Sequence, residues 1–170
     1  MTIAPPRHLS REPSPPREPG VAGPALGPVI VTAVLVVHDG ATWLKACLDA
    51  LGLQTRLPDR LVIVDTGSTD RSRLIATGHD RVREVFGEPV IISAPRECTF
   101  GEAVGRAVEQ LSAAWGSSWN PDAQDWLWLL HDDSAAAPEA LALLLDAARR
   151  SPSVGIAGPK LTTWDDPSRL

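Results

Sequence analysis

The chain has 170 residues, the length of one ordinary domain, and 44% of them are hydrophobic, as in a typical globular core. Its net charge of −5 and its scattered lysines and arginines form no basic surface that would bind phosphate backbones, which excludes DNA and RNA as partners. The apolar run VIVTAVLVV is too short to cross a bilayer, which needs about 20 apolar residues, so we expect no membrane span in this chain.

The first 28 residues form a separate compositional region. They hold eight of the sixteen prolines, and scattered arginines and glutamates replace any apolar periodicity. Such a segment cannot bury enough surface to order itself. It also lacks the apolar stretch that follows the charges of a secretory signal. We therefore predict a disordered Pro-rich tail over residues 1–28 and a folded region over residues 29–170.

The folded region begins with two strand-then-helix units. Residues 29–37 are apolar and largely β-branched, as expected of a strand buried on both faces. Residues 61–64 form a second short apolar strand, and a turn and a short helix that ends near Gly78 follow it. The helix between these strands has its apolar positions on one face, at Leu44, Cys47, Leu48 and Leu51.

The same order continues to the end of the chain. A weaker strand lies near residues 90–92 and precedes a helix over residues 100–111. A strand over residues 126–130 and a helix over residues 138–150 come next, and residues 154–157 are predicted as the last strand. Strands that alternate with helices predict a mostly parallel sheet with helices on both faces.

Three polar clusters follow three of the predicted strands. HDG occupies residues 38–40, DTGSTD occupies residues 65–70 and HDD occupies residues 131–133. All three lie at the carboxyl ends of strands, which share one edge of an open parallel sheet. Ligands bind in the crevice at that edge, so we expect the three clusters to form one site.

Each cluster also has a plainer explanation. HDG is compatible with a solvated turn, and Asp65 with Ser68 is compatible with turn and helix-cap chemistry. Asp132 and Asp133 are harder to explain in this way, because the following helix already has a start signal at Pro138. Adjacent carboxylates repel each other, and their burial is costly. The HDD cluster therefore indicates a function.

Successive side chains in extended backbone point to opposite sides, so Asp132 and Asp133 can address two different partners. One can hold a sugar hydroxyl and the other a divalent metal. Carboxylate oxygens suit Mg²⁺ or Mn²⁺, and Mg²⁺ is usually held by one or two carboxylates together with substrate phosphates. This chemistry is that of a site for a nucleotide diphosphate.

The runs VTAVLVVHDGATWLKACLDALGLQT and PDRLVIVDTGSTDRS, followed by WLWLLHDDSAAAPEALALLLDAARRSPSVGIAGPKL, resemble the N-terminal, nucleotide-sugar-binding part of a family 2 glycosyltransferase. The tryptophan-rich WLWLLHDD form is most similar to large actinobacterial members. The resemblance implies the glycosyltransferase A fold, an α/β Rossmann-like sheet that is incomplete at the C-terminus. It also implies inverting transfer of a sugar from a UDP- or dTDP-linked donor, with Mg²⁺ or Mn²⁺, to a hydroxyl of a carbohydrate or lipid-linked acceptor in cell-envelope polysaccharide or glycolipid synthesis.

The resemblance also implies roles by position. Asp65 would accept a hydrogen bond from the donor base, Asp132 would contact the ribose and Asp133 would ligate the metal. Backbone near Val37 and His38 would line the base pocket. The implied nucleotide-sugar contacts are Val37, His38, Asp65, Gly67, Ser68 and Asp132.

The chain departs from the family pattern in three ways. His131 stands in the first place of the usual Asp-x-Asp signature, which excludes a metal ligand at that position. Val104 and Gly105 stand where the family usually has an Arg-Asn pair. The acceptor-side base is expected beyond Leu170, so we expect this chain to be inactive alone. The alternative is a non-catalytic nucleotide-binding module or an inactive fragment.

The remaining signals concern cysteine, tryptophan and compartment. Cys47 and Cys98 are far apart and form no CxxC motif, which is typical of reduced thiols. We therefore expect a cytoplasmic protein, at the inner face of the plasma membrane in full-length, membrane-associated relatives.

Trp126 and Trp128 alternate along their strand and are predicted to pack between sheet and helix. For His131, the sequence leaves open a bond to phosphate or a role as a strand cap.

Overall fold

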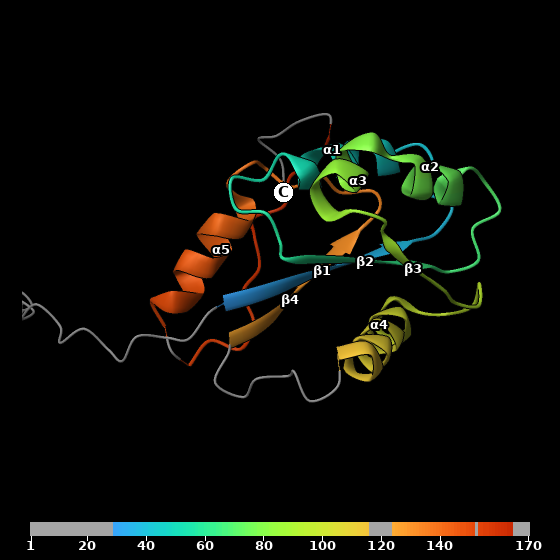
Figure 1. The fold of residues 1–170 in the computed structure, drawn as a ribbon. Coiled ribbons are helices and arrows are strands. Elements are labelled where there is room, and N and C mark those ends of the chain that lie inside the picture. Colours follow the sequence, from blue (N-terminus) through green and yellow to red (C-terminus); the bar gives the residue numbers. More distant parts are fainter. Residues whose placement is uncertain (1–28, 116–123, 152, 165–170) are drawn as a thin grey trace, which may run out of the picture.

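Four parallel strands form the centre of the protein (Figure 1). The computed structural model describes residues 29–115, 124–151 and 153–164, so the predicted tail lies outside the described residues. The strands lie side by side in the order β3-β2-β1-β4. Their bounds are Val29–Val37 for β1, Arg60–Asp65 for β2, Val90–Ser93 for β3 and Gln124–His131 for β4.

Helices cover both faces of this sheet (Figure 1). On one face, alternate residues of β1 pack with four helices, whose bounds are Leu44–Gly52 for α1, Ser72–Gly78 for α2, Asp80–Phe86 for α3 and Ala140–Arg149 for α5. On the other face, Val34 and Val36 of β1 pack with Ala103 and Ala107 of α4 (Phe100–Trp115). The predicted α/β class, with helices on both faces, is confirmed.

The core on the α1 face should dominate the stability of the protein. Leu48 of α1 is fully buried there, among β-strand and helix residues. Leu48→Ala is expected to lower the free energy of unfolding by about 2–5 kcal/mol, because it removes buried apolar surface and leaves a cavity. Leu53, just past the end of α1, is largely exposed. Leu53→Ala is the control and should change stability by less than about 0.5 kcal/mol in urea unfolding. A similar loss for both variants would contradict this placement of the core.

Helix α3 is an element that the sequence did not predict. Its seven residues begin after His79, whose imidazole accepts a hydrogen bond from the backbone N–H of Val82 at 3.3 Å. The His79 side chain thus caps the first turn, although histidine is not among the usual N-cap residues. The missed helix lies between the predicted end of the preceding helix, at Gly78, and strand β3.

The predicted last strand over residues 154–157 is wrong. The segment lies within the described residues, has no strand pairing and leaves Ile156 93% exposed. Its chain instead turns, with the N–H of Val154 donating to the carbonyl of Ser151 at 2.9 Å. A short apolar run becomes a strand only where a neighbouring strand can pair with it, and the Gly-Pro pair that follows favours a turn.

The other elements agree with their predicted positions and differ at their ends. Strands β2 and β4 are longer than predicted, α4 extends to Trp115 and α5 begins two residues later than Pro138. Trp128 is buried and Trp126 partly buried against the α1 face, as predicted. Among the described residues, no helix combines the length and the apolar character that a membrane crossing requires.

Candidate functional site

The strand register brings the three polar clusters to one edge of the sheet. Val37 at the end of β1 lies beside Asp65 at the end of β2, and Val36 lies beside His131 at the end of β4. The loops that follow these strands therefore start side by side. We call this edge, formed by residues 37–41, 65–70, 93–99 and 131–134, the carboxyl edge.

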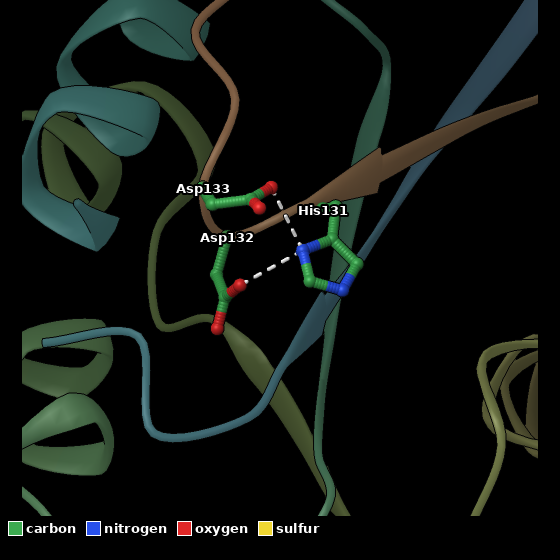
Figure 2. Close-up of side chains that lie close together, drawn as sticks. All are labelled: His131, Asp132 and Asp133. Atoms are coloured by element: carbon green, nitrogen blue, oxygen red, sulfur yellow. Dashed lines mark hydrogen bonds and ion pairs between the residues drawn. The ribbon is translucent and has the colours of Figure 1, made fainter.

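The HDD cluster is compact and its two carboxylates differ in environment. Nδ1 of His131 lies 2.9 Å from Oδ1 of Asp133 and 3.0 Å from Oδ1 of Asp132 (Figure 2). Asp132 is only 2% exposed, whereas the side chain of Asp133 is 63% exposed. The expectation that extended backbone points these two side chains to opposite sides is wrong: residues 132 and 133 lie in a turn after β4, and both carboxylates approach Nδ1 of His131. The shared contact with His131 was not foreseen.

Asp132 is built into the loop that follows β1. Its Oδ2 accepts a hydrogen bond from the backbone N–H of His38 at 2.7 Å. Gly40 lies directly against it, because a Cβ atom at Gly40 would be 2.1 Å from the same oxygen. Burial raises the pKa of Asp132, and the hydrogen bond from His38 opposes that rise. Position 40 therefore has to be glycine for the carboxylate to sit where it does.

The loops after β1 and β2 are joined by Thr66. Its backbone N–H and its hydroxyl both donate to the carbonyl of Val37, at 2.9 and 3.0 Å. Nδ1 of His38 lies 3.0 Å from the carbonyl oxygen of Thr66 and 2.8 Å from its hydroxyl. The carbonyl of Val37 and the imidazole Nδ1 of His38 are thus engaged within the protein. Both predicted residues lie at the carboxyl edge.

Asp39 and Arg96 tie together the loops after β1, β2 and β3. Asp39 has a φ of 50°, and its Oδ1 accepts from the N–H of Thr69 at 2.6 Å. Its Oδ2 forms an ion pair with Arg96, which also donates to the carbonyl of Gly67 at 3.0 Å. The hydrogen bonds from Arg96 and Thr69 hold the pKa of Asp39 well below its usual range. Gly67 has a φ of 67°, which favours glycine.

Asp65 has the turn contact that its simpler explanation predicts. It is buried, and its Oδ1 accepts a hydrogen bond from the N–H of Ser68 at 3.0 Å. Its Oδ2 lies 3.4 Å from the guanidinium of Arg73, which donates to the hydroxyl of Ser93 at 2.8 Å. The hydroxyl of Ser68 in turn accepts from the N–H of Asp39 at 3.1 Å. Asp65 and Ser68 therefore shape the loop, and contact of Asp65 with a base stays a prediction.

Several residues at this edge were missed by the sequence predictions. Arg96 is the clearest, since it places a cation among three loops. The signal that could have identified it is its position just after the third strand, at the same edge. Phe100, the first residue of α4, stacks on the ring of His131 with 5.9 Å between ring centroids. Helix α4 therefore reaches the site through its first residue, whereas Val104 packs against the core on that face.

The chemistry of the HDD cluster fits a divalent cation. The possible ligand atoms of its three residues all lie within 4.8 Å of one another. Carboxylate oxygens are the ligands that Mg²⁺ and Mn²⁺ prefer, whereas imidazole suits zinc and other transition metals better. Asp133 has an exposed carboxylate and is the better placed ligand for a hard cation. His131 adds a nitrogen at the position where the sequence pattern excluded a metal ligand.

A cavity of about 510 Å³ lies elsewhere, between α1, α2 and α3. It contains none of the residues of the carboxyl edge; its lining residues are Lys45, Asp49, Leu74, Ile75, Gly78, His79, Asp80 and Arg81. The volume of a cavity alone does not identify a site. The convergence of strand ends and carboxylates makes the carboxyl edge the stronger candidate.

The parallel sheet, its helices on both faces and the polar loops at its carboxyl edge define an α/β protein whose architecture is like that of the glycosyltransferase A fold. The fold is similar to that of TarS of S. aureus, with a TM-score of 0.51 over 81% of this chain and 24% of that one, at 14% sequence identity. The chain belongs to glycosyl transferase family 2, because the model of that family matches residues 32–163. This membership confirms the resemblance found in the sequence motifs.

Two mycobacterial proteins are similar over most of the chain. Galactofuranosyltransferase GlfT1 of Mycobacterium tuberculosis is 33% identical over 142 residues, which cover 82% of this chain and 42% of the relative. N-acetylglucosaminyl-diphospho-decaprenol L-rhamnosyltransferase of the same species is 29% identical over 136 residues, which cover 80% of this chain and 42% of the relative. The matched region thus spans less than half of either relative.

Proposed function

We propose that the carboxyl edge binds a nucleotide-diphosphate sugar together with Mg²⁺ or Mn²⁺, as the donor site of an inverting glycosyltransferase. The observation that carries this proposal is the pairing of a buried Asp132 with an exposed Asp133 at the end of β4. The buried carboxylate is tied to the β1 loop, and the exposed one is available to a ligand. Turn chemistry alone gives no reason for this division.

The proposed roles follow from position along the sheet. Asp65, at the end of β2, receives the base, and residues 37–38 after β1 together with residues 67–68 after β2 line its pocket. Asp132 holds a ribose hydroxyl through Oδ1, which also lies 3.0 Å from Nδ1 of His131; because Asp132 is only 2% exposed, this contact requires the surrounding loops to open when the ligand binds. His131 lies between the two aspartates and orients both carboxylates. Arg96 lies close enough to the same loops to add positive charge toward a diphosphate.

Asp133 would hold the cation. When bound, the metal offsets the negative charge of the diphosphate leaving group. Inverting transfer also requires a base that removes the proton of the acceptor hydroxyl as its oxygen attacks the anomeric carbon. The sequence prediction places that base beyond Leu170, so the described residues would supply donor binding.

The biological setting is part of the proposal. The names of both mycobacterial relatives describe transfer of a sugar, and one names a decaprenol-linked acceptor. By analogy, the donor of this chain is a UDP- or dTDP-linked sugar. Its acceptor is a carbohydrate or a lipid-linked saccharide of the cell envelope, reached at the inner face of the plasma membrane.

A second candidate is a nucleotide-binding module without activity of its own. It is favoured by the roles proposed for the described residues, which all belong to donor binding. Calorimetry with UDP and dTDP, with and without Mn²⁺, tests the proposed donor site. Binding that strengthens with Mn²⁺ supports the donor site, and no binding under either condition would count against it. Turnover of a UDP-sugar by this chain would eliminate the binding-only alternative.

Asp65→Ala should weaken binding of the nucleoside diphosphate to the same extent with and without Mn²⁺, because its proposed partner is the base. Loss of a charge-assisted hydrogen bond corresponds to about 1.5–3 kcal/mol, or about ten- to a hundredfold in affinity. Calorimetry measures the affinity, and Glu84→Ala on the exposed side of α3 is the control.

Asp65→Asn separates the base contact from the loop contact. Its amide oxygen can still accept from the N–H of Ser68, so this variant should keep the loop in place. Its thermal midpoint should stay near that of the parent protein. Parental affinity in Asp65→Ala would remove Asp65 from the base site.

A further inference from the structure

Two tryptophans from distant parts of the sequence stack beside the HDD cluster. The rings of Trp43 and Trp164 have centroids 5.3 Å apart and an angle of 21° between their planes. Trp43 precedes α1, and Trp164 is the last residue that the structure describes. The two side chains nevertheless stay 44% and 49% exposed. We call them the tryptophan pair.

The tryptophan pair is fastened to the carboxyl edge at two points. The indole N–H of Trp164 donates to the carbonyl of Asp133 at 2.8 Å. The backbone N–H of Trp43 donates to the carbonyl of Gly40 at 2.9 Å, and Gly40 lies against Asp132. Trp164 therefore contacts Asp133 directly, and Trp43 is linked to Asp132 through Gly40.

The pair and Phe100 come from different elements around the site. Trp43 leads into α1, and Phe100 begins α4, which are helices on opposite faces of the sheet. Phe100 stacks on His131. Aromatic residues from separate parts of the chain thus contact the HDD cluster, Phe100 through the ring of His131 and Trp164 through the carbonyl of Asp133. The base site is proposed at Asp65 at the end of β2, whereas the pair is hydrogen-bonded through Trp164 to Asp133, in the HDD cluster after β4.

The surface that the pair presents is apolar, with a carboxylate at its border. The indole N–H of Trp164 donates to a backbone carbonyl, so this ring can contact a ligand through its apolar face. The carboxylate of Asp133 is exposed beside it. Ligand sites combine such aromatic surfaces with a few placed polar groups. A sugar ring has this mixed character, because its C–H groups form an apolar face and its hydroxyls donate hydrogen bonds.

We infer that the tryptophan pair is a platform on which a sugar ring stacks next to Asp133. The inference rests on the proposed donor site and adds the surface that recognises the sugar. Two sources share this chemistry: the sugar carried by the nucleotide and the terminal sugar of an acceptor. A hydrocarbon chain would gain nothing from the charged border, and burial of that charge by an apolar chain would be costly.

Fluorine NMR of the protein labelled with fluorotryptophan tests the platform directly. Trp43→Phe and Trp164→Phe assign the two lines, and the lines of Trp126 and Trp128 between β4 and the helices serve as internal controls. One arm compares UDP and dTDP with UDP-glucose, UDP-galactose and dTDP-rhamnose, all with Mg²⁺. The other arm titrates the methyl glycosides of the same three sugars at millimolar concentrations.

The inference is supported if the lines of Trp43 and Trp164 shift with a sugar while those of Trp126 and Trp128 stay in place. A shift with the nucleotide sugar beyond that with the nucleotide alone identifies the donor sugar, and a shift with a methyl glycoside identifies the acceptor sugar. If no sugar in either arm moves these two lines, the platform is refuted. A shift caused equally by the nucleotide alone would also refute it, because the base would then be the stacked group.

Affinity measurements distinguish a sugar-binding role of the tryptophan pair from a purely structural role. Trp43→Ala should reduce the sugar-dependent part of binding by about two- to tenfold, the range expected for one aromatic contact. Its affinity for UDP with Mg²⁺ should stay at the parental value. Loss of thermal stability in Trp43→Ala with unchanged sugar binding would assign the pair to structure alone. Absence of UDP binding in the parent protein would instead refute the donor site and leave the glycoside arm to decide on the platform.

Discussion

Gly40→Ala is expected to be among the most damaging single substitutions at the carboxyl edge. The added Cβ would lie 2.1 Å from Oδ2 and 2.5 Å from Cγ of Asp132, distances at which one of the groups has to move. Asp132 cannot move without losing the hydrogen bond from the N–H of His38. Overpacking and the loss of a bond to a buried carboxylate together correspond to about 2–4 kcal/mol of unfolding free energy.

Gly105→Ala is the matched control for this substitution. Gly105 lies within α4, and a Cβ there has no neighbour within 4 Å. The same chemical change should therefore stabilise the protein by about 0.5–1 kcal/mol, because alanine favours helix more than glycine does. Urea unfolding of the two variants should give changes of opposite sign.

A double-mutant cycle locates the cause of the Gly40 effect. In an Asp132→Ala background most of the clash is absent, so Gly40→Ala should cost less than in the parent protein. An equal cost in both backgrounds would show that Asp132 is not the group that Gly40 accommodates. Tolerance of Gly40→Ala in the parent protein would contradict the close approach itself.

The central elements could be predicted because their sequence patterns are local. The β-branched run of β1 and the one-sided apolar face of α1 each determine their own structure, and the tertiary contacts agree with them. Helix α3 was missed because its cap is a histidine. Residues 154–157 were misassigned because strand formation depends on a partner that the local pattern does not reveal.

The candidate site could be predicted only as far as its strand ends. Placing the polar clusters at one edge required just the parallel topology. The partners of the clusters come from tertiary geometry. The ion pair of Arg96 with Asp39 joins two separate loops. The stack of Trp43 on Trp164 joins two residues that are 121 positions apart in the sequence. The position of Arg96 after the third strand could have placed it at this edge, but the sequence shows the partner in neither contact.

The two aspartates of the HDD cluster should respond differently to the same change. Asp133→Asn is nearly isosteric and removes the charge of the exposed carboxylate, so it should abolish the Mn²⁺-dependent gain in affinity for a nucleoside diphosphate. Weak binding without metal should remain, because the base and ribose contacts are unchanged. Because this aspartate is exposed and contacts only His131 through its side chain in the described structure, the protein should fold normally.

Asp132→Asn should instead keep the metal dependence. Its amide oxygen can still accept from the N–H of His38, which preserves the loop after β1. The variant loses a charge-assisted hydrogen bond to the ribose, which corresponds to about 1.5–3 kcal/mol, or about ten- to a hundredfold in affinity at every metal concentration. Thus one variant changes the slope of affinity against Mn²⁺, and the other lowers affinity throughout.

The competing explanation, that both aspartates are turn and cap residues, makes a different prediction. Each substitution should then lower the unfolding free energy by about 1 kcal/mol and leave ligand binding as it was. Titration of UDP into both variants and the parent protein at matched Mn²⁺ concentrations distinguishes the two explanations. If both variants retain the metal dependence of the parent, the HDD cluster is no donor site. The proposed function would then lose its main support, because Asp65 and its neighbours already have a structural role in the loop.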